Sequence, residues 1–330
     1  MGILLRGLAA AGGIRVVAAD TTSVIREAVT RQNASNTAGA AIGRTMTAAV
    51  LLSHVLLKSP RDRVTVRLSG DGPLGSVTAD AGLDHTVRGF ALNPELELPL
   101  RPDGKLDVGG AVGRDGDVHV IRSHAPYGDP YSATVALTSG EVGEDIATYL
   151  AVSEQIPSAV MLGVHFAPEG VVDVAGGVIL QALPDADPAA LTLLEANIKA
   201  LGALTSAMQR APLAEVVEQE ICWGLDYELL TKPPLDVRFE CRCSDQSALE
   251  ALAYFSPLER EQMIAEDGGA EVVCHWCGQR RWLDAAAIAT LTGAETRCPT
   301  CGTLWYREGR TRVYRDGELC SCGRPVTLGN

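Results

Sequence analysis

The sequence predicts an α+β protein with a mixed sheet-and-helix N-terminal body, a helical linker, and a small C-terminal zinc domain followed by a second zinc ribbon. Three observations lead to this fold class. Strand-like and helix-like apolar periodicities are interspersed up to about residue 182. Two amphipathic helical patterns follow, and all nine cysteines lie at or beyond Cys222. We therefore expect four segments, residues 1–182, 183–233, 234–291 and 292–330.

Three helices are expected in the N-terminal body. Thr22–Gln32 begins with Thr22 as its cap and has one apolar face, formed by Val24, Ile25, Ala28 and Val29. Ala38–Leu57 is rich in Ala and Leu, and we expect it to be buried. A third helix opens at Ser139 or Gly140 and continues to Gln155.

Alternating apolar residues predict the strands of this body. The expected strands are Arg63–Leu68, Ser76–Ala79, Leu106–Val112, Val118–Arg122, Ser132–Leu137, and a closing pair formed by Ala159–Phe166 and Val171–Leu180. Asp115 and Gly116 form a two-residue turn signal, which predicts a hairpin between the third and fourth of these strands.

The helical linker begins where Asp187 and Pro188 supply a cap and a first-turn proline. Apolar residues then recur at steps of three and four, at Leu191, Leu194, Ile198, Leu201 and Leu204. A second helix is expected near Pro212, with Val216, Val217 and Ile221 on its apolar face. Such a stripe has to dock on another apolar surface, so the linker should pack against the body.

Composition limits the possible partners and compartment. Apolar residues make up 46% and charged residues 21% of the chain, as in a soluble globular protein. The net charge of −13 makes nucleic acid an unlikely partner, because an acidic surface repels phosphates. We find no apolar run of membrane-spanning length and no signal peptide, so we expect a cytoplasmic protein in which thiols stay reduced and bind metal.

Eight of the cysteines form two sets of four. Cys241 and Cys243 precede Cys274 and Cys277 by thirty residues. The second set has the reverse order, with Cys298 and Cys301 followed after eighteen residues by Cys320 and Cys322. Four thiolates match the tetrahedral coordination of zinc, so the sequence predicts one Zn2+ ion for each set.

Two interpretations of these sites remain open. As plain zinc sites they would hold short segments that have little apolar core of their own. As a switch, a zinc-bound thiolate would stay nucleophilic, and an oxidant would close disulfides between the nearest neighbours, Cys241 with Cys243 and Cys274 with Cys277. Losing a structural zinc removes on the order of 10 kcal/mol or more, so oxidation would then unfold the segment.

Local signals surround both sets. Ser244 and Ser256 are expected to cap two short helices, the second through a capping box with Glu259, before a Glu271–Cys274 strand. Arg242, Arg280 and Arg281 flank the first set and would stabilise thiolates. In the second set, Thr303–Tyr306 and Thr311–Tyr314 have the pattern of the two strands of an inert zinc ribbon.

These features resemble the heat shock protein 33 family of redox-regulated holdase chaperones, over residues 3–291. The motifs that carry the resemblance are the two cysteine pairs of the first set, Ala265–Gly268 (AEDG), Gly70–Leu74 (GDGPL), Gly109 and Gly110 with Gly113, and Ser153–Pro157 (SEQIP). The resemblance implies that the reduced zinc form is inactive. It further implies that oxidation forms two disulfides from Cys241, Cys243, Cys274 and Cys277, releases zinc, unfolds the zinc domain and linker, and promotes homodimerisation. The exposed surface would then bind unfolding client proteins without ATP.

We expect the family pattern to end near the Asp284–Leu291 helix. Residues 292–330 therefore depart from that pattern. The second set of cysteines is therefore either a second sensor, a brake on the first, or an inert ribbon. The tail carries six basic and four acidic residues, which supports an alternative class of function, a zinc-ribbon module acting on RNA or the ribosome.

Other motifs in the sequence give weaker evidence of function. Gly70–Gly75 fits a dinucleotide-binding glycine pattern, but the strand-like residues after it favour a strand-turn-strand. We expect His54 on a buried helix face, His119 in a hairpin and His124 in a loop. His275 lies inside the first cysteine knuckle, where we expect either an exposed residue without a role or one that modulates the site. Cys222 is either a small buried apolar residue or a third redox thiol. No catalytic constellation is recognised, so we do not expect an enzyme.

Overall fold

The computed structural model describes residues 1–124 and 129–291, together with the backbone of residues 296–297 and 304–305. The chain divides into two compact units, Met1–Cys241 and Arg242–Asn330, which we call the N-terminal and C-terminal units. This boundary lies within the first cysteine pair. The finer division into four segments remains a prediction.

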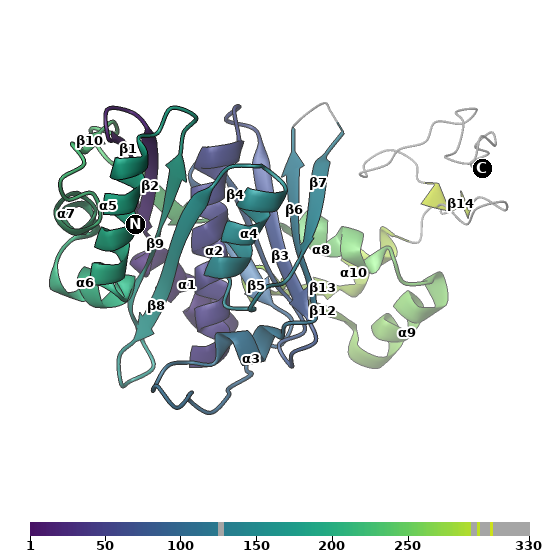
Figure 1. The fold of residues 1–330 in the computed structure, drawn as a ribbon. Coiled ribbons are helices and arrows are strands. Elements are labelled where there is room, and N and C mark those ends of the chain that lie inside the picture. Colours follow the sequence, from purple (N-terminus) through teal and green to yellow (C-terminus); the bar gives the residue numbers. More distant parts are fainter. Residues whose placement is uncertain (125–128, 292–295, 298–303, 306–330) are drawn as a thin grey trace. The chain divides into compact units, whose positions relative to one another are not determined.

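An eleven-stranded sheet organises the N-terminal unit (Figure 1). Its order is β7 (Tyr131–Ala136), β6 (Gly116–Ser123), β3 (Arg63–Gly70), β4 (Val77–Gly82), β5 (Thr86–Ala91), β11 (Leu235–Phe239), β1 (Gly2–Ala9), β2 (Ile14–Asp20), β9 (Val172–Ala182) and β8 (Ser158–Phe166), with β10 (Glu228–Leu229) also paired to β1. Neighbours are antiparallel apart from β11 and β5, which are parallel. The predicted closing pair is confirmed as β8 and β9.

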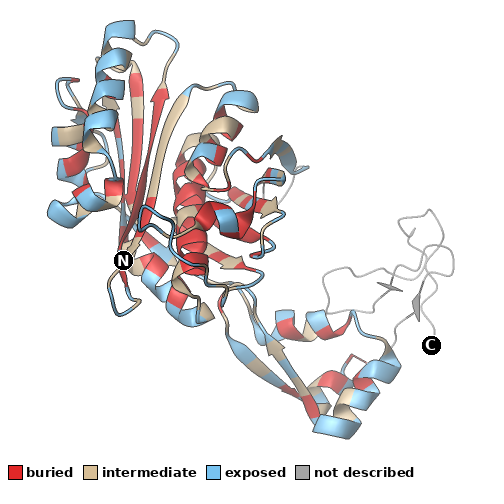
Figure 2. Ribbon diagram, turned by 60° about the horizontal axis from the view of Figure 1, so that its bottom comes forward, coloured by how far each residue is buried: buried red, intermediate tan, exposed pale blue. Residues whose placement is uncertain are grey.

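Two helices form the core with this sheet. They are α1 (Thr22–Gln32) and α2 (Asn36–Leu56), and the predicted apolar face of α1 is buried. Helix α2 packs against strands of both halves of the sheet and is almost wholly buried (Figure 2). By length and composition α2 could cross a membrane, but 83% of its apolar window lies inside the unit, which is the environment of a core helix.

The linker helices cover the other face of β1, β2 and β9. They are α5 (Pro188–Leu201), α6 (Leu204–Arg210), α7 (Leu213–Val216) and a π-helical turn, η1 (Val217–Ile221). Strand residues alternate between the two layers: Leu4, Val17 and Ile179 join the α1–α2 core, whereas Leu5, Val16 and Val178 join the linker cluster. The predicted docking of the apolar stripe is confirmed within this unit.

Two predictions in this unit were wrong. Leu106–Val112 is not a strand, since Val108–Val112 forms a short helix, α3, whose cap Asp107 accepts a hydrogen bond from the Gly110 amide. The Asp115–Gly116 hairpin is consequently absent, and β6 pairs with β3 and β7 instead.

Helix ends also differ from the expected positions. Thr21, not Thr22, precedes α1. Helix α4 (Gly143–Val152) starts later than expected because the loop before it wraps the Asp145 carboxylate. That carboxylate accepts hydrogen bonds from the amides of Thr138, Ser139, Gly140 and Val142.

The C-terminal unit has a far smaller core. Helices α8 (Asp245–Leu252), α9 (Pro257–Asp267) and α10 (Ala285–Ala289) surround the hairpin of β12 (Gly269–Val273) and β13 (Arg280–Asp284). Among its described residues the buried apolar cluster consists of Ala248, Leu252, Ala253, Leu283, Ile288 and Leu291. The predicted caps Ser244 and Ser256 are confirmed, both with capping boxes.

Candidate metal centre

The second cysteine pair of the first set lies in the turn that joins β12 to β13. The Gly278 amide donates to the Cys274 carbonyl at 2.8 Å, and the Cys274 amide donates to the Gln279 carbonyl at 2.9 Å. Gly278 has φ of 69°, a left-handed conformation that glycine adopts without a Cβ clash. The turn is therefore a compact knuckle that places two sulfurs side by side.

The first pair follows β11 and precedes α8. The sulfur atoms of Cys241, Cys243, Cys274 and Cys277 all lie within 4.8 Å of one another, and Cys243 Sγ is 3.6 Å from Cys277 Sγ. Cys277 is buried and the other three are half-buried. Two cysteine pairs with thirty residues between them in the sequence are thus brought to one point.

This cluster fits a tetrahedral metal ion. Zinc–sulfur bonds of about 2.3 Å place neighbouring sulfurs of a tetrahedron about 3.8 Å apart. The Cys243–Cys277 separation of 3.6 Å is close to that value, the other sulfurs lie within 4.8 Å, and thiolates are soft ligands that suit zinc. The four cysteines could therefore hold one metal ion.

A cation sits beside the cluster. Arg281 Nη2 lies 3.6 Å from Cys243 Sγ and donates to the Cys243 carbonyl at 3.3 Å, while Nη1 bonds the Asp245 carboxylate. Hydrogen bonds to Cys243 and Asp245 raise the pKa of Arg281. Arg280 instead pairs with Glu271 at 2.9 Å. Arg281 is thus placed to stabilise negative charge on Cys243.

The second cysteine set, Cys298, Cys301, Cys320 and Cys322, lies outside the described residues. Nearby, the described strands β14 (Thr296–Arg297) and β15 (Leu304–Trp305) are antiparallel partners that bracket Cys298 and Cys301 in sequence. The described strand β15 lies within the expected strand Thr303–Tyr306, and its pairing with Thr311–Tyr314 remains a prediction. Thr311–Tyr314 is outside the described part of the chain.

The lone linker cysteine is buried. Cys222 is 2% exposed and belongs to the apolar cluster beneath the linker helices. Burial raises the pKa of its thiol to about 12, so little thiolate forms at neutral pH. These observations favour the small apolar residue over a third redox thiol while the linker is docked.

The histidines and the glycine turn behave largely as predicted. His54 is buried near the end of α2 and its ring stacks on that of His85 at 5.3 Å. Burial lowers the pKa of His54 to about 4, and neighbouring His85 and Arg6 act in the same direction. His275 is exposed. The Gly70–Gly75 segment joins β3 to β4, so strand-turn-strand is confirmed.

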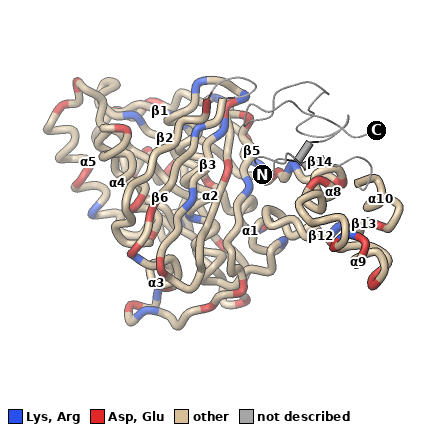
Figure 3. Tube along the Cα trace, turned by 90° about the vertical axis from the view of Figure 1, so that its right-hand side faces the viewer, with Lys and Arg blue, Asp and Glu red and all other residues tan. Residues whose placement is uncertain are grey.

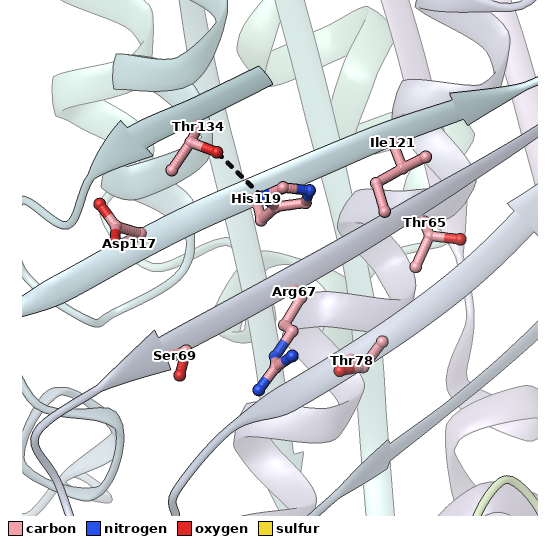
Figure 4. A pocket seen from close by; sticks show the side chains of 8 residues that line it. All are labelled: Thr65, Arg67, Ser69, Thr78, Asp117, His119, Ile121 and Thr134. Carbon is pink, nitrogen blue, oxygen red and sulfur yellow. Dashed lines mark hydrogen bonds between the residues drawn. The ribbon is translucent and has the colours of Figure 1, made fainter. Parts of the chain in front are cut away.

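A polar hollow of about 410 Å3 lies on the outer face of β3, β4, β6 and β7 (Figure 4). Arg67 and hydroxyl side chains line it, and the Thr134 hydroxyl lies 2.9 Å from His119 Nδ1. His119 and Thr134 are directly opposite in the β6–β7 register, so this is an ordinary cross-strand polar pair. We assign no chemistry to the hollow.

Sequence reasoning missed β11, the strand that leads into the cysteines. Residues Leu235–Glu240 alternate apolar and charged side chains, which is the signature of a half-buried strand.

Charges are interspersed along the described chain. Figure 3 shows basic and acidic positions alternating over the N-terminal unit, and many basic groups pair locally, as Arg63 does with Asp80 at 2.9 Å. This distribution carries no argument for a nucleic-acid surface.

Comparison with known proteins identifies the family. A sequence profile of the family described as "Hsp33 protein" matches residues 3–284. The "33 kDa chaperonin" of a Thermus thermophilus strain is 49% identical over 99% of this chain and 98% of its own length. That of Deinococcus radiodurans is 45% identical over 89% of this chain and 99% of its own length.

A solved structure shows the same fold. The crystal structure of the 33 kDa chaperonin (heat shock protein 33 homologue) from Thermotoga maritima matches with a TM-score of 0.79 at 33% identity, over 88% of this chain and 97% of that chain. The predicted α+β fold class is thereby confirmed.

The same comparisons correct one expectation and establish the family. An alignment that covers 99% of this chain includes most of residues 292–330, so the Thermus thermophilus relative shares this segment. It is not a departure from every member, although the family profile ends at residue 284. With the profile, the relatives and the solved structure in agreement, the chain belongs to the Hsp33 family of chaperones.

Proposed function

We propose that this protein is an ATP-independent holdase that oxidation activates through Cys241, Cys243, Cys274 and Cys277. One observation carries the proposal: four thiols lie within 4.8 Å of one another, and three of them belong to a unit with a small apolar core. A fold of this kind depends on what its sulfurs bind. Chemistry at sulfur can therefore decide whether the unit is folded.

When bound, zinc would join the four thiolates and supply the cross-link that the small core lacks. Arg281 stabilises thiolate at Cys243, which keeps that sulfur nucleophilic toward a peroxide. For each disulfide, two thiolates, two protons and one hydrogen peroxide give one disulfide and two waters. The oxidised sulfurs would no longer be ligands, so a bound zinc ion would be released.

The pairs proposed are Cys241 with Cys243 and Cys274 with Cys277. Spatial distance alone does not select them, because Cys243 also lies 3.6 Å from Cys277. Sequence proximity does, since it persists once the unit unfolds, whereas a cross-pair needs the folded arrangement.

Unfolding of the zinc domain then propagates to the linker helices. Their release uncovers the apolar face of β1, β2 and β9, which Leu194, Leu204, Leu213 and Val216 cover in the docked state. Unfolding clients bind there without ATP, residues 1–182 act as the client and dimer domain, and the oxidised form is a homodimer. We place the protein in the cytoplasm, where peroxide stress would turn the switch on.

The test is light scattering of a client that aggregates on heating. Peroxide-treated protein should suppress the signal, and dithiothreitol-reduced zinc protein should not. Equal suppression by both forms would exclude the switch while leaving a chaperone.

For the second cysteine set we propose a second zinc ion. Metal analysis of the reduced full chain should give about two zinc ions, one for each set of four thiolates, and a chain ending at Leu291 about one. A value near one for the full chain would refute the second site.

A further inference from the structure

One segment, Leu225–Glu240, runs along the edge of β1 that lies opposite β2 in the N-terminal unit, and we call it the strap. It begins just after η1, where the Ala10 amide donates to the Leu225 carbonyl at 2.5 Å. Glu228–Leu229 pairs with β1, and the Leu230 amide donates to the Arg6 carbonyl at 2.8 Å. The strap ends as β11, directly before Cys241.

Strand β11 is hydrogen-bonded on both sides. It is antiparallel to β1, with Val237 opposite Gly2 and Leu235 opposite Leu4. It is parallel to β5, where the Arg238 amide donates to the His85 carbonyl at 3.0 Å and the Glu240 amide to the Val87 carbonyl at 3.1 Å. In the sheet as described, β11 is the one strand that joins the β1 half to the β5 half.

The side chains of β11 alternate sharply. Val237 is fully buried in the α1–α2 core, and Leu235 and Phe239 pack against that core. Asp236 and Arg238 are exposed. The Arg31 guanidinium lies 5.3 Å from the centre of the Phe239 ring. The strand thus fills a place with three apolar positions on one side and solvent on the other.

We propose that the place of β11 between β1 and β5 is a binding slot for an extended segment of a client protein, opened when the strap leaves. This inference rests on the proposed function, because unfolding that starts at Cys241 reaches β11 first along the chain. Removing one strand leaves two edges about 9.6 Å apart, twice the usual spacing between strands. That gap accepts one extended chain.

The occupant is defined by what fills the slot now. Backbone groups of β1 and β5 bond any extended chain on both sides, so recognition does not require one sequence. The apolar positions of Leu235, Val237 and Phe239 select segments with alternating apolar residues, which a folded protein hides and an unfolding protein exposes. The slot therefore distinguishes unfolded from folded clients.

The test uses a fluorescent peptide of residues 234–240 and the full chain. The peptide should bind the peroxide-activated protein, compete with an unfolded client for it, and leave the reduced protein alone because its own strap fills the slot. A Val237→Asp peptide should bind about tenfold or more weakly, because it loses the buried apolar contact. An Arg238→Pro peptide should also lose affinity, because it lacks the N–H that bonds the His85 carbonyl.

Hydrogen exchange supplies the second readout. The amides of β1 and β5 should lose protection on activation and regain it when the native peptide is added. If these amides stay protected after activation, the slot proposal is refuted. That result is expected if β1 pairs directly with β5, or if the strap of a second copy takes the place of β11. Peptide binding without client competition would overturn it as a client site.

The aggregation assay on the same sample separates the two proposals. Activated protein that suppresses aggregation but fails to bind the peptide refutes the slot and leaves the switch intact. If the activated protein does not suppress client aggregation, both the switch and the slot are refuted.

Discussion

The two units of this chain are held together in different ways. The N-terminal unit buries a continuous core between an eleven-stranded sheet and α1–α2. The C-terminal unit, in its described part, buries six apolar residues, and three of its sulfurs lie close to one another and to the sulfur of Cys241, the last residue of the N-terminal unit. Under the proposed function, the second unit would be stable only while its sulfurs share a metal ion, whereas the first unit does not depend on one. An oxidant would then unfold the C-terminal unit and spare the N-terminal unit.

The linker and strap combine features of both units. They pack on the N-terminal unit through ordinary apolar contacts, yet their last residues run directly into Cys241. Their docking is thus connected to the sulfur chemistry along the chain, and the predictions below separate the three regions.

The largest effect should follow loss of one sulfur ligand. Cys277→Ser should abolish tight zinc binding at the first cysteine set, worth on the order of 10 kcal/mol in such sites, and unfold the described part of the C-terminal unit. Hydrogen exchange should show loss of protection in β12, β13 and α8 with the α2 core unchanged. The matched control, Cys222→Ser, should keep its zinc; unfolding of α2 in Cys277→Ser would contradict the independence of the units.

Truncating one buried leucine of the linker should weaken its docking on the N-terminal unit. Leu194→Ala should cost roughly 2–5 kcal/mol of linker packing, and alkylation of Cys222, read by mass spectrometry, should accelerate without peroxide. The neighbouring Leu193→Ala, on the exposed side of α5, should leave alkylation unchanged. Equal rates for both variants would show that the apolar stripe does not hold the linker.

The core of the N-terminal unit should respond to pH through His54. Its pKa is about 4 in the folded protein and near 6.5 when unfolded, so the unfolded state binds the proton first as pH falls. Stability is therefore full above pH 6.5 and is lost toward pH 4, by about 3 kcal/mol. Urea unfolding of His54→Leu should lack this share of the pH dependence; an identical slope in both proteins would remove His54 as its source.

The smallest effect concerns a helix cap in the C-terminal unit. Ser256 accepts a hydrogen bond from the Glu259 amide and its own amide donates to the Glu259 carboxylate at 2.7 Å. Ser256→Ala should cost about 1 kcal/mol and raise the rate of zinc loss to a chelator modestly. A rate as high as that of Cys277→Ser would mean that caps, not sulfur, hold the unit.

Sequence signals were sufficient where local chemistry decides the structure. Cysteine spacing, the Ser244 and Ser256 caps, and the Asp187 cap with Pro188 all depend on residues close in sequence. The same holds for α1 and for the β8–β9 pair, whose apolar periodicity is plain.

Sequence patterns failed to predict strands that are buried on both faces, because such strands show no alternation of apolar and polar residues. Strands β1 and β2 are apolar on both sides, since helices cover each face, so no alternation marks them. Leu106–Val112 alternates like a strand but is turned into a helix by its Asp107 cap. The joining of two sheet halves by β11 depends on pairings between residues far apart in sequence, such as Gly2 with Val237 and Thr86 with Arg238, which no local pattern reports.

The central claim is that sulfur chemistry at the four-cysteine cluster controls client binding. The most direct measurement titrates reduced zinc protein with peroxide and follows released zinc and suppression of client aggregation in the same samples. Released zinc and suppression of aggregation should rise together, with half-maximal values at the same peroxide dose. Full suppression while zinc is retained at the first site, or complete zinc loss without suppression, would contradict it.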